Sequence, residues 1–173
     1  MSGVALKETC RAMGGRVPLW PWHHARLEAG GVPVEQLALA EERVAQAAAE
    51  WAGVATRRAR LTLVVSPDGA VKVDGAQRLS SLDVPNGLLV ARIDVADLPP
   101  VPTPAAKPAD RSWWDAAHRR AEALRAHQAA LVDPGGLIID GSTAAIWIAE
   151  NGTLFTTPAP PAIPLIQSSL FDL

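Results

Sequence analysis

Residues 107–140 read KPADRSWWDAAHRRAEALRAHQAALVDPGGLIID and contain, in order, a lysine, an arginine-rich helical segment, a turn and a carboxylate. Lys107 is one of three lysines in a chain that has thirteen arginines, and it follows a proline-rich segment. Lysine, unlike arginine, can lose its proton and bond covalently to a carbonyl carbon. This placement, just before a helix and ahead of Asp140, makes Lys107 a candidate for covalent chemistry.

The composition argues against several classes of function. Acidic and basic residues are interspersed in a chain of net charge −2 that has no tyrosine, so no basic stripe or stacking platform predicts nucleic-acid binding. Cys10 is the single cysteine, so neither a disulfide nor a cysteine-based zinc site is available within one chain, and we expect no metal. No signal-like segment and no membrane-spanning apolar run occurs, so we expect a cytoplasmic protein without membrane contact.

The first half of the chain alternates predicted strands and helices. Glycine pairs, single prolines and a Pro-Asp-Gly turn separate several of the segments, and in the longer helix the apolar residues recur at intervals of three and four. The predicted strands cover residues 3–13, 16–20, 60–66, 70–73 and 87–95, and the predicted helices cover residues 22–30 and 33–51. This half is predicted to be a layered α+β unit.

A proline-rich connector divides the chain. Residues 98–106 (LPPVPTPAA) place four prolines in nine positions, which favours an extended linker. We therefore predict an N-terminal α+β domain at residues 1–97 and a second domain at residues 107–173. The second domain is predicted to be mostly sheet, with a helix at residues 112–128, strands at 130–132, 137–139 and 144–149, and turns at Gly135-Gly136 and Asn151-Gly152.

Several blocks of the sequence, taken in order, resemble the class IV aminotransferases and 4-amino-4-deoxychorismate lyases, which are pyridoxal-phosphate enzymes of fold type IV. The family patterns are F-E-T-x-R, H-x-x-R-L, K-x-x-N-R, E-G-S-x-x-N-[IL]-F and D-G-x-L…T-P. The corresponding blocks here are residues 6–11 (LKETCR), 23–27 (HHARL), 107–111 (KPADR), 140–147 (DGSTAAIW) and 151–158 (NGTLFTTP). The resemblance implies a small two-layer α/β domain followed by an incomplete pseudo-barrel α+β domain.

The resemblance also implies a site for pyridoxal 5'-phosphate. Lys107 would bind the cofactor covalently and move protons at the substrate carbon, and Arg26 would hold the phosphate. Asp140 stands where the family has a glutamate against the pyridine nitrogen, and Ser142 and Thr143 would add nearby contacts. The substrate would be a small amino compound and the assembly a homodimer.

Each of these residues also has a structural interpretation. Lys107, judged by its chemistry alone, is more often a solvated surface charge than a catalytic group. Arg26 can cap or salt-bridge its own helix, and Asp140 can form a turn with the following glycine. His23 and His24 are more often partly buried helix residues than bases or metal ligands, and Ser142 and Thr143 are equally suited to a turn.

Three functions therefore remain open. The first is a lyase that eliminates pyruvate from aminodeoxychorismate and leaves 4-aminobenzoate for folate biosynthesis, because residues 6–11 and 23–27 look closest to that branch. The second is an aminotransferase acting on branched-chain or D-amino acids. The third is a truncated or diverged, non-catalytic protein, because Asp140 is shorter than glutamate by about 1.5 Å and the chain lacks the G-[IV]-x-R that follows T-P in the family. The lyase is the leading hypothesis.

Overall fold

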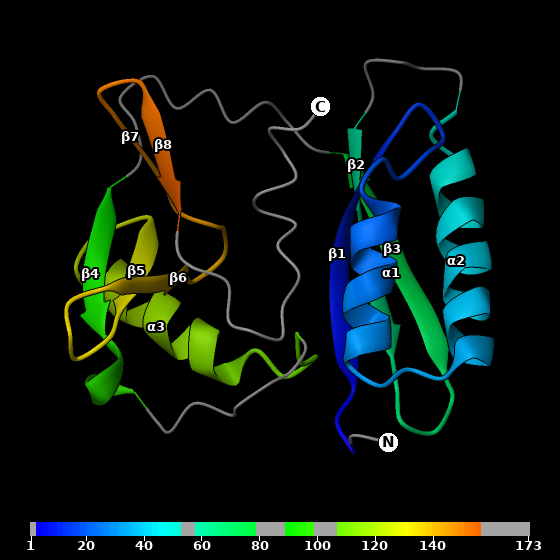
Figure 1. Ribbon diagram of the computed structural model, residues 1–173, viewed down its shortest axis with the longest axis horizontal. Helices are drawn as coiled ribbons and strands as arrows, with labels where there is room; N and C mark the ends of the chain where they lie inside the picture. The colour runs from blue at the N-terminus through cyan, green and yellow to red at the C-terminus, as the bar shows by residue number, and fades with distance from the viewer. Residues whose placement is uncertain (1–2, 53–57, 79–88, 99–106, 157–173) are drawn as a thin grey trace. The chain divides into compact units, whose positions relative to one another are not determined.

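The computed structural model describes residues 3–52, 58–78, 89–98 and 107–156 (Figure 1). These residues form two compact units. Unit 1 contains residues 3–52, 58–78 and 107–109, and unit 2 contains residues 89–98 and 110–156. Both units combine helices with sheet, so the predicted α+β class is confirmed.

Each of the two units combines segments from both predicted domains or from the two sides of the predicted linker. The strand predicted at residues 87–95, placed by the sequence in the N-terminal domain, pairs with a strand of unit 2. Residues 107–109, placed by the sequence in the second domain, pair with a strand of unit 1. Hydrogen bonds between strands decide both assignments. The amino-acid composition of the predicted linker carries no information about these hydrogen bonds.

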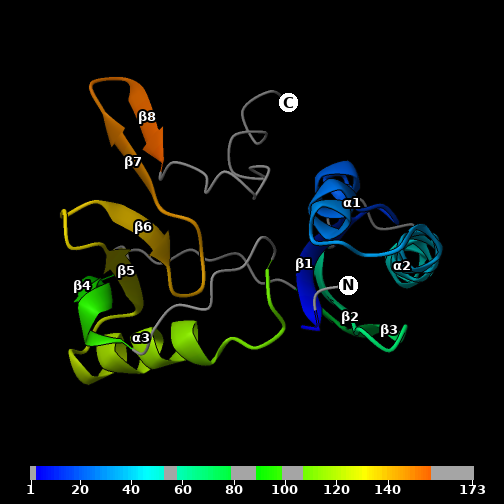
Figure 2. The same cartoon turned by 60° about the horizontal axis from the view of Figure 1, so that its bottom comes forward.

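Unit 1 is a three-stranded antiparallel sheet with two helices on one face (Figures 1 and 2). Its strands are β1 (Leu6–Met13), β2 (Arg58–Val65) and β3 (Val71–Arg78), in the order β1-β2-β3. The helices are α1 (Trp20–Ala29) and α2 (Val34–Ala49), which confirm the two predicted helices with ends shifted by a few residues.

The core of unit 1 follows from the two periodicities of the sequence. Strand β1 alternates buried and outward residues, and helix α2 presents one apolar stripe to the sheet. The buried apolar residues of these two elements are Leu6, Cys10, Ala12, Leu37, Ala40, Val44 and Ala48. The same alternation buries Glu8, a charged residue at a core position.

The strand predicted at residues 16–20 is wrong. Gly14 and Gly15 form the predicted turn, with φ of 57° and 77°, but pairing stops at a single bridge between Met13 and Arg16. Pro18 has no N–H to donate, and the chain enters α1 at Trp20. Strand β1 pairs along its whole length with β2 instead.

Unit 2 contains a second three-stranded sheet, a helix and a hairpin. The sheet consists of β4 (Val90–Asp94), β5 (Gln128–Val132) and β6 (Ile138–Gly141), with β4 parallel and β6 antiparallel to β5. A short 3-10 turn, η1 (Val95–Asp97), follows β4, and helix α3 (Ser112–Ala123) packs on β4 and β5. The Asn151-Gly152 turn joins β7 (Trp147–Glu150) to β8 (Thr153–Thr156), as predicted.

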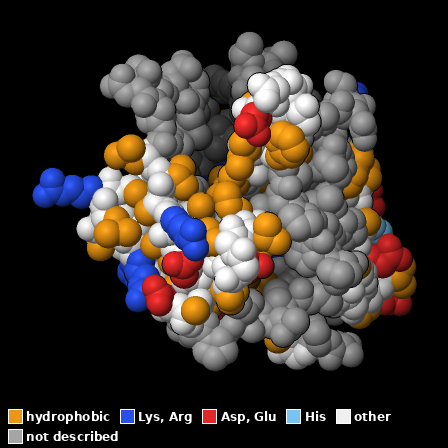
Figure 3. All heavy atoms as spheres, turned by 60° about the vertical axis from the view of Figure 1, so that its left-hand side comes forward, with side chains coloured by type: hydrophobic (Ala, Val, Ile, Leu, Met, Phe, Trp, Pro, Cys, Tyr) orange, Lys and Arg blue, Asp and Glu red, His pale blue; other side chains and the backbone are white. Residues whose placement is uncertain are grey.

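The sheets of the described residues remain open, in agreement with the expected incomplete barrel. Within unit 2 the packed core lies between α3 and the sheet and includes Trp113, Trp114, Ile93 and Leu131. Apolar side chains also gather on the surface shown in Figure 3. The large exposed apolar residues of unit 2 are Leu89, Val90, Leu124, Leu137, Ile139, Ile148 and Phe155.

Helix α3 ends five residues earlier than predicted, at Ala123. Arg125 adopts φ of 59°, a left-handed conformation, and its N–H donates to the Glu122 carbonyl. The N–H of Ala126 then donates to the Ala121 carbonyl at 2.9 Å, which completes a Schellman termination. This position usually carries glycine. Because it is an arginine here, nothing in the sequence indicates that the helix ends before it.

Arg125→Gly should therefore raise the free energy of unfolding by about 0.5–1 kcal/mol. Glycine removes roughly 1–2 kcal/mol of strain from the left-handed conformation. Part of this gain is offset, because glycine gives the unfolded chain more conformational entropy to lose on folding. Arg119→Gly, at an exposed position inside the same helix, should instead lower it by about 1 kcal/mol. Chemical denaturation followed by circular dichroism measures both. Equal destabilisation by the two variants would contradict the described helix end.

Candidate functional site

A buried carboxylate links β1 to α1 in unit 1. Glu8 is 1% exposed, and its Oε2 lies 2.7 Å from His23 Nδ1. Arg26 Nε donates to Glu8 Oε1 at 2.6 Å, and Arg26 Nη2 donates to Oε2. His23 and Arg26 are three residues apart on α1, so they share the face that meets the strand. The three side chains form one buried ionic cluster.

This cluster keeps Glu8 ionised. Burial alone raises the pKa of Glu8, but the hydrogen bonds from His23 and Arg26 and their charges outweigh burial and lower the pKa below its ordinary value. An arginine that binds a carboxylate through Nε and Nη2 has a fixed plane and direction. The guanidinium of Arg26 is therefore oriented by the fold.

Arg26 keeps binding capacity after this pairing. Its side chain is 12% exposed, and Nη1 has no hydrogen-bond partner among the described residues. A guanidinium with one edge held and one nitrogen available suits an anionic oxygen, since it is permanently charged and already in place. The role of Arg26 in phosphate binding, predicted from the sequence, stays a prediction that this geometry accommodates.

Lys107 lies in the same unit as Arg26. Its carbonyl accepts from the N–H of Lys7 at 2.9 Å, and Ala109 N donates to the Ala5 carbonyl at 2.7 Å, so residues 107–109 extend the edge of β1. The pKa of the Cys10 thiol is raised to about 12, first by burial and then by the charge of Glu8, whereas the charges of Arg26 and Lys107 act in the lowering direction. The charges of Arg26 and Lys107 therefore both influence the same buried thiol of unit 1.

Asp140 lies in unit 2, on β6, and its carboxylate has two donors. Trp114 Nε1 donates to Oδ2 at 3.0 Å, and the N–H of Gly141 donates to Oδ1 at 2.8 Å. Arg111 lies over the Trp114 ring, with Cζ 4.0 Å from the ring centroid. Burial lowers the pKa of Arg111, whereas the charges of Asp140 and Asp115 raise it. The carboxylate of Asp140 thus has fixed neighbours.

Ser142 and Thr143 hold the loop that follows Asp140. The Ser142 hydroxyl donates to Gln128 Oε1, accepts from Ala129 N at 3.1 Å and lies 3.2 Å from His118 Nδ1. These contacts use the full capacity of a hydroxyl group. Thr143 is exposed; its N–H donates to Gln128 Oε1 at 3.0 Å, and its Oγ1 accepts from Gln128 Nε2. Direct cofactor contacts of Ser142 and Thr143 stay predictions.

The predicted site residues therefore form two groups. Lys107 and Arg26 belong to unit 1, and Asp140, Ser142 and Thr143 belong to unit 2.

Sequence reasoning missed the residues that support these groups. Glu8 was part of a quoted motif, and the alternation of Leu6, Cys10 and Ala12 around it already indicated burial. A buried carboxylate needs charged partners, so a buried Glu8 predicts that basic residues from another segment pair with it. No comparable signal existed for Trp114 or Gln128, because their contacts join residues that are 26 and 15 positions apart.

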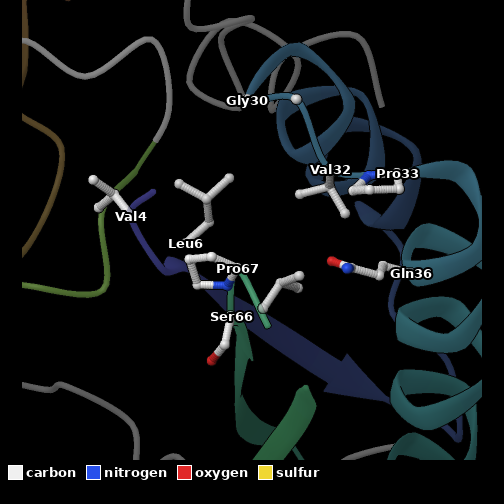
Figure 4. A pocket seen from close by; sticks show the side chains of 10 residues that line it. Val4, Leu6, Gly30, Val32, Pro33, Gln36, Ser66 and Pro67 are labelled. Atoms are coloured by element: carbon white, nitrogen blue, oxygen red, sulfur yellow. The ribbon is translucent and has the colours of Figure 1, made fainter. Parts of the chain in front are cut away.

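The pocket shown in Figure 4 is too small for a substrate. It lies in unit 1, where the start of β1 and the end of β2 meet the α1–α2 connection, and its volume is about 20 Å³, room for about one water molecule. A wider open groove of about 340 Å³ in unit 2, beside α3, contains none of the predicted site residues. Among the described residues, no cluster of His, Cys, Asp and Glu suits a metal ion, and no helix is long and apolar enough to span a membrane.

Comparison with known families identifies the chain. The sequence model of the family described as amino-transferase class IV matches residues 5–161, which is most of the chain. The chain therefore belongs to the class IV aminotransferase family. No curated protein sequence matches it significantly.

Solved structures agree with this assignment. A proposed 4-amino-4-deoxychorismate lyase superposes with a TM-score of 0.66 at 22% identity, over 90% of this chain and 64% of that one. A hypothetical aminotransferase from Mycobacterium tuberculosis, in its PLP-bound form, gives 0.73 at 21% identity, over 99% and 68%. A fold type IV transaminase from Curtobacterium pusillum gives 0.70 at 20% identity, over 99% and 64%.

These likenesses show the fold. The chain spans slightly less than two thirds of the length of the proposed lyase. The reaction, the substrate and the assembly of the whole protein therefore have to be argued from the residues.

Glu8→Gln should lower the free energy of unfolding by about 3 kcal/mol, because it leaves a buried cation without its countercharge. It should also change the pH dependence. The folded-state pKa of Glu8 is below the ordinary value of 4.5, so its stabilisation is present above about pH 4.5 and is lost as the pH falls through the lower value. The variant should show a flatter stability curve in that acid range.

Denaturant titrations at a series of pH values measure both effects. Glu42→Gln, at an exposed position of α2, is the matched control and should change stability by less than about 0.5 kcal/mol. A Glu8 variant that is as stable as this control would contradict the buried ionic cluster.

Gly141→Ala should disrupt the segment that carries Asp140 and Ser142. A Cβ at Gly141 would clash with the Ala144 carbonyl oxygen, a backbone atom that cannot move alone. We expect destabilisation by about 1–3 kcal/mol, measured by thermal and chemical denaturation. Gly3→Ala, where a Cβ meets nothing within 4 Å, is the control. Equal stability of the two variants would show that the described loop conformation is incorrect.

Proposed function

We propose that this chain binds pyridoxal 5'-phosphate and acts with it on a small amino substrate. The observation that carries the proposal is the arrangement in unit 1, where Lys107 is anchored beside β1 and Arg26 is oriented by Glu8 with one nitrogen available. An amine, a fixed guanidinium and a carboxylate are the groups that the aldehyde, the phosphate and the ring nitrogen of this cofactor require. The Mycobacterium tuberculosis relative was solved in a PLP-bound form.

Each residue has a defined part in this proposal. When bound, the cofactor supplies an electron sink that stabilises negative charge at the substrate carbon. Arg26 Nη1 binds a phosphate oxygen, while Glu8 keeps the guanidinium in place. Lys107 would hold the cofactor through a bond from its amine nitrogen to the aldehyde carbon, formed with loss of water. Once the amino group of the substrate has replaced it there, the lysine amine would carry a proton to or from the substrate carbon. Asp140 accepts the hydrogen bond of the protonated ring nitrogen, with its carboxylate held by the Trp114 indole.

The leading reaction is elimination of pyruvate from aminodeoxychorismate, which leaves 4-aminobenzoate, an intermediate of folate biosynthesis. Its support is the sequence of residues 6–11 and 23–27, together with the structural likeness to a proposed lyase of this kind. Aminotransfer to a keto acid is the second candidate, supported by the likeness to two aminotransferases. A homodimer and a small-molecule substrate belong to both versions of the proposal.

The first test concerns Lys107. After incubation with pyridoxal phosphate and reduction with borohydride, the chain should retain the cofactor covalently, and peptide mass spectrometry should locate it on Lys107. Lys107→Arg should retain none, since its guanidinium keeps the charge but does not attack the aldehyde. Lys72→Arg, an exposed lysine on β3, is the control and should behave like the unchanged chain.

The outcomes separate the functional readings. Retention on another lysine, or none at all, would overturn the proposal and favour the non-catalytic reading. Given retention on Lys107, pyruvate formed without any amino acceptor supports the lyase, and strict dependence on a 2-oxo acid supports the aminotransferase.

A further inference from the structure

Asp140 lies on the side of the sheet that α3 covers. It pairs with Leu131 across β5 and β6, and residues directly opposite in an antiparallel pair point to the same face. Leu131 is fully buried in the cluster that α3 forms with the sheet. Asp140 therefore places a carboxylate at the margin of an apolar core, where an unpaired charge is costly.

The donors of Asp140 leave part of each carboxylate oxygen available. Trp114 Nε1 binds Oδ2 and Gly141 N binds Oδ1, which is one donor for each oxygen. A carboxylate has about four lone-pair positions, so about two remain for another donor. The carboxylate is thus fixed in direction without being saturated by the contacts of the described residues.

Trp114 is itself held firmly. It is 7% exposed and packs edge-on against Trp113, with ring centroids 5.1 Å apart and an interplanar angle of 82°. Arg111 covers the Trp114 ring, and its Nη2 donates to the Ser142 carbonyl at 3.4 Å. The start of α3 therefore contacts the segment 140–142 at two points, one on each side of Gly141.

An indole differs here from any other large apolar side chain. Phenylalanine or leucine would also fill the core, but neither has a hydrogen to donate to Asp140. The nitrogen of Trp114 provides the only side-chain hydrogen bond to Asp140 among the described residues.

We propose that Trp114 is a positioning residue that holds the Asp140 carboxylate for its contact with the cofactor ring nitrogen. This inference rests on the proposed function and adds to it a residue that acts through Asp140. Trp114→Phe removes the N–H and keeps most of the ring, so it should weaken cofactor affinity about tenfold, the effect of losing one hydrogen bond to a charged group. Circular dichroism verifies that the variant is folded.

The first measurement does not depend on the cofactor. In ¹H–¹⁵N spectra of the free chain, Asp140→Asn should shift the indole N–H resonance of Trp114, which Trp114→Phe identifies by its disappearance. The indole resonance of Trp20, which lies in unit 1, is the internal control and should not move. An unchanged Trp114 resonance in Asp140→Asn overturns the inference whatever the cofactor does.

The second measurement is a double-mutant cycle on the dissociation constant of pyridoxal phosphate, determined by equilibrium dialysis. If Trp114 acts through Asp140, the tenfold loss caused by Trp114→Phe should largely vanish in an Asp140→Ala background. Trp113→Phe, which changes the neighbouring buried indole in the same way, should not be coupled to Asp140→Ala. Equal losses from Trp114→Phe in both backgrounds would assign Trp114 a merely structural role and overturn the inference.

The proposed function fails separately. If the wild-type chain does not bind pyridoxal phosphate, the proposed function is contradicted, and so is the positioning role of Trp114 toward the cofactor. The indole resonance still decides independently whether Trp114 and Asp140 form a pair. Binding by the unchanged chain, with no weakening in Trp114→Phe, contradicts the positioning role alone.

Discussion

The charge of Glu8 inside unit 1 constrains the rest of that unit. Strand alternation forces this carboxylate into the core, where it is stable only beside cations. His23 and Arg26 meet this need from one face of α1, so the helix is fixed in direction and rotation relative to β1. The same contact that neutralises Glu8 orients the Arg26 guanidinium. Stability and the fixed direction of the Arg26 guanidinium therefore come from one interaction.

In the described part of unit 2 a carboxylate is held by neutral hydrogen-bond donors and not by cations. There the charge that matters is the carboxylate of Asp140, and no cation binds it directly among the described residues. Neutral donors hold it instead, one from the Trp114 indole and one from the Gly141 backbone. A carboxylate held by neutral N–H groups stays directed yet retains its net charge, which suits it to a positively charged partner. The proposed roles of the two residues differ in the same way, since Arg26 is proposed to bind the phosphate and Asp140 the protonated ring nitrogen.

Much of this architecture was predictable from local patterns. The stripe of α2, the strands β2 and β5 and the Asn151-Gly152 hairpin follow from periodicity and turn chemistry. The end of α3 was not predictable, because Arg125 occupies a left-handed position where glycine normally signals termination. The segment 16–20 was misjudged, because a glycine turn permits a hairpin but does not supply the second strand.

By itself, the sequence determined the family, through short motifs in a fixed order, and hence the candidates Lys107, Arg26 and Asp140. Which residues support them was decided only by the tertiary structure. Residues 107–109 join unit 1 because their backbone pairs with β1, although the sequence predicted them to belong to the second domain. Trp114 reaches Asp140 because α3 packs on β5, the strand that pairs with β6. The physical reason is that local propensity acts over a few residues, whereas pairing and burial act between segments that only folding brings together.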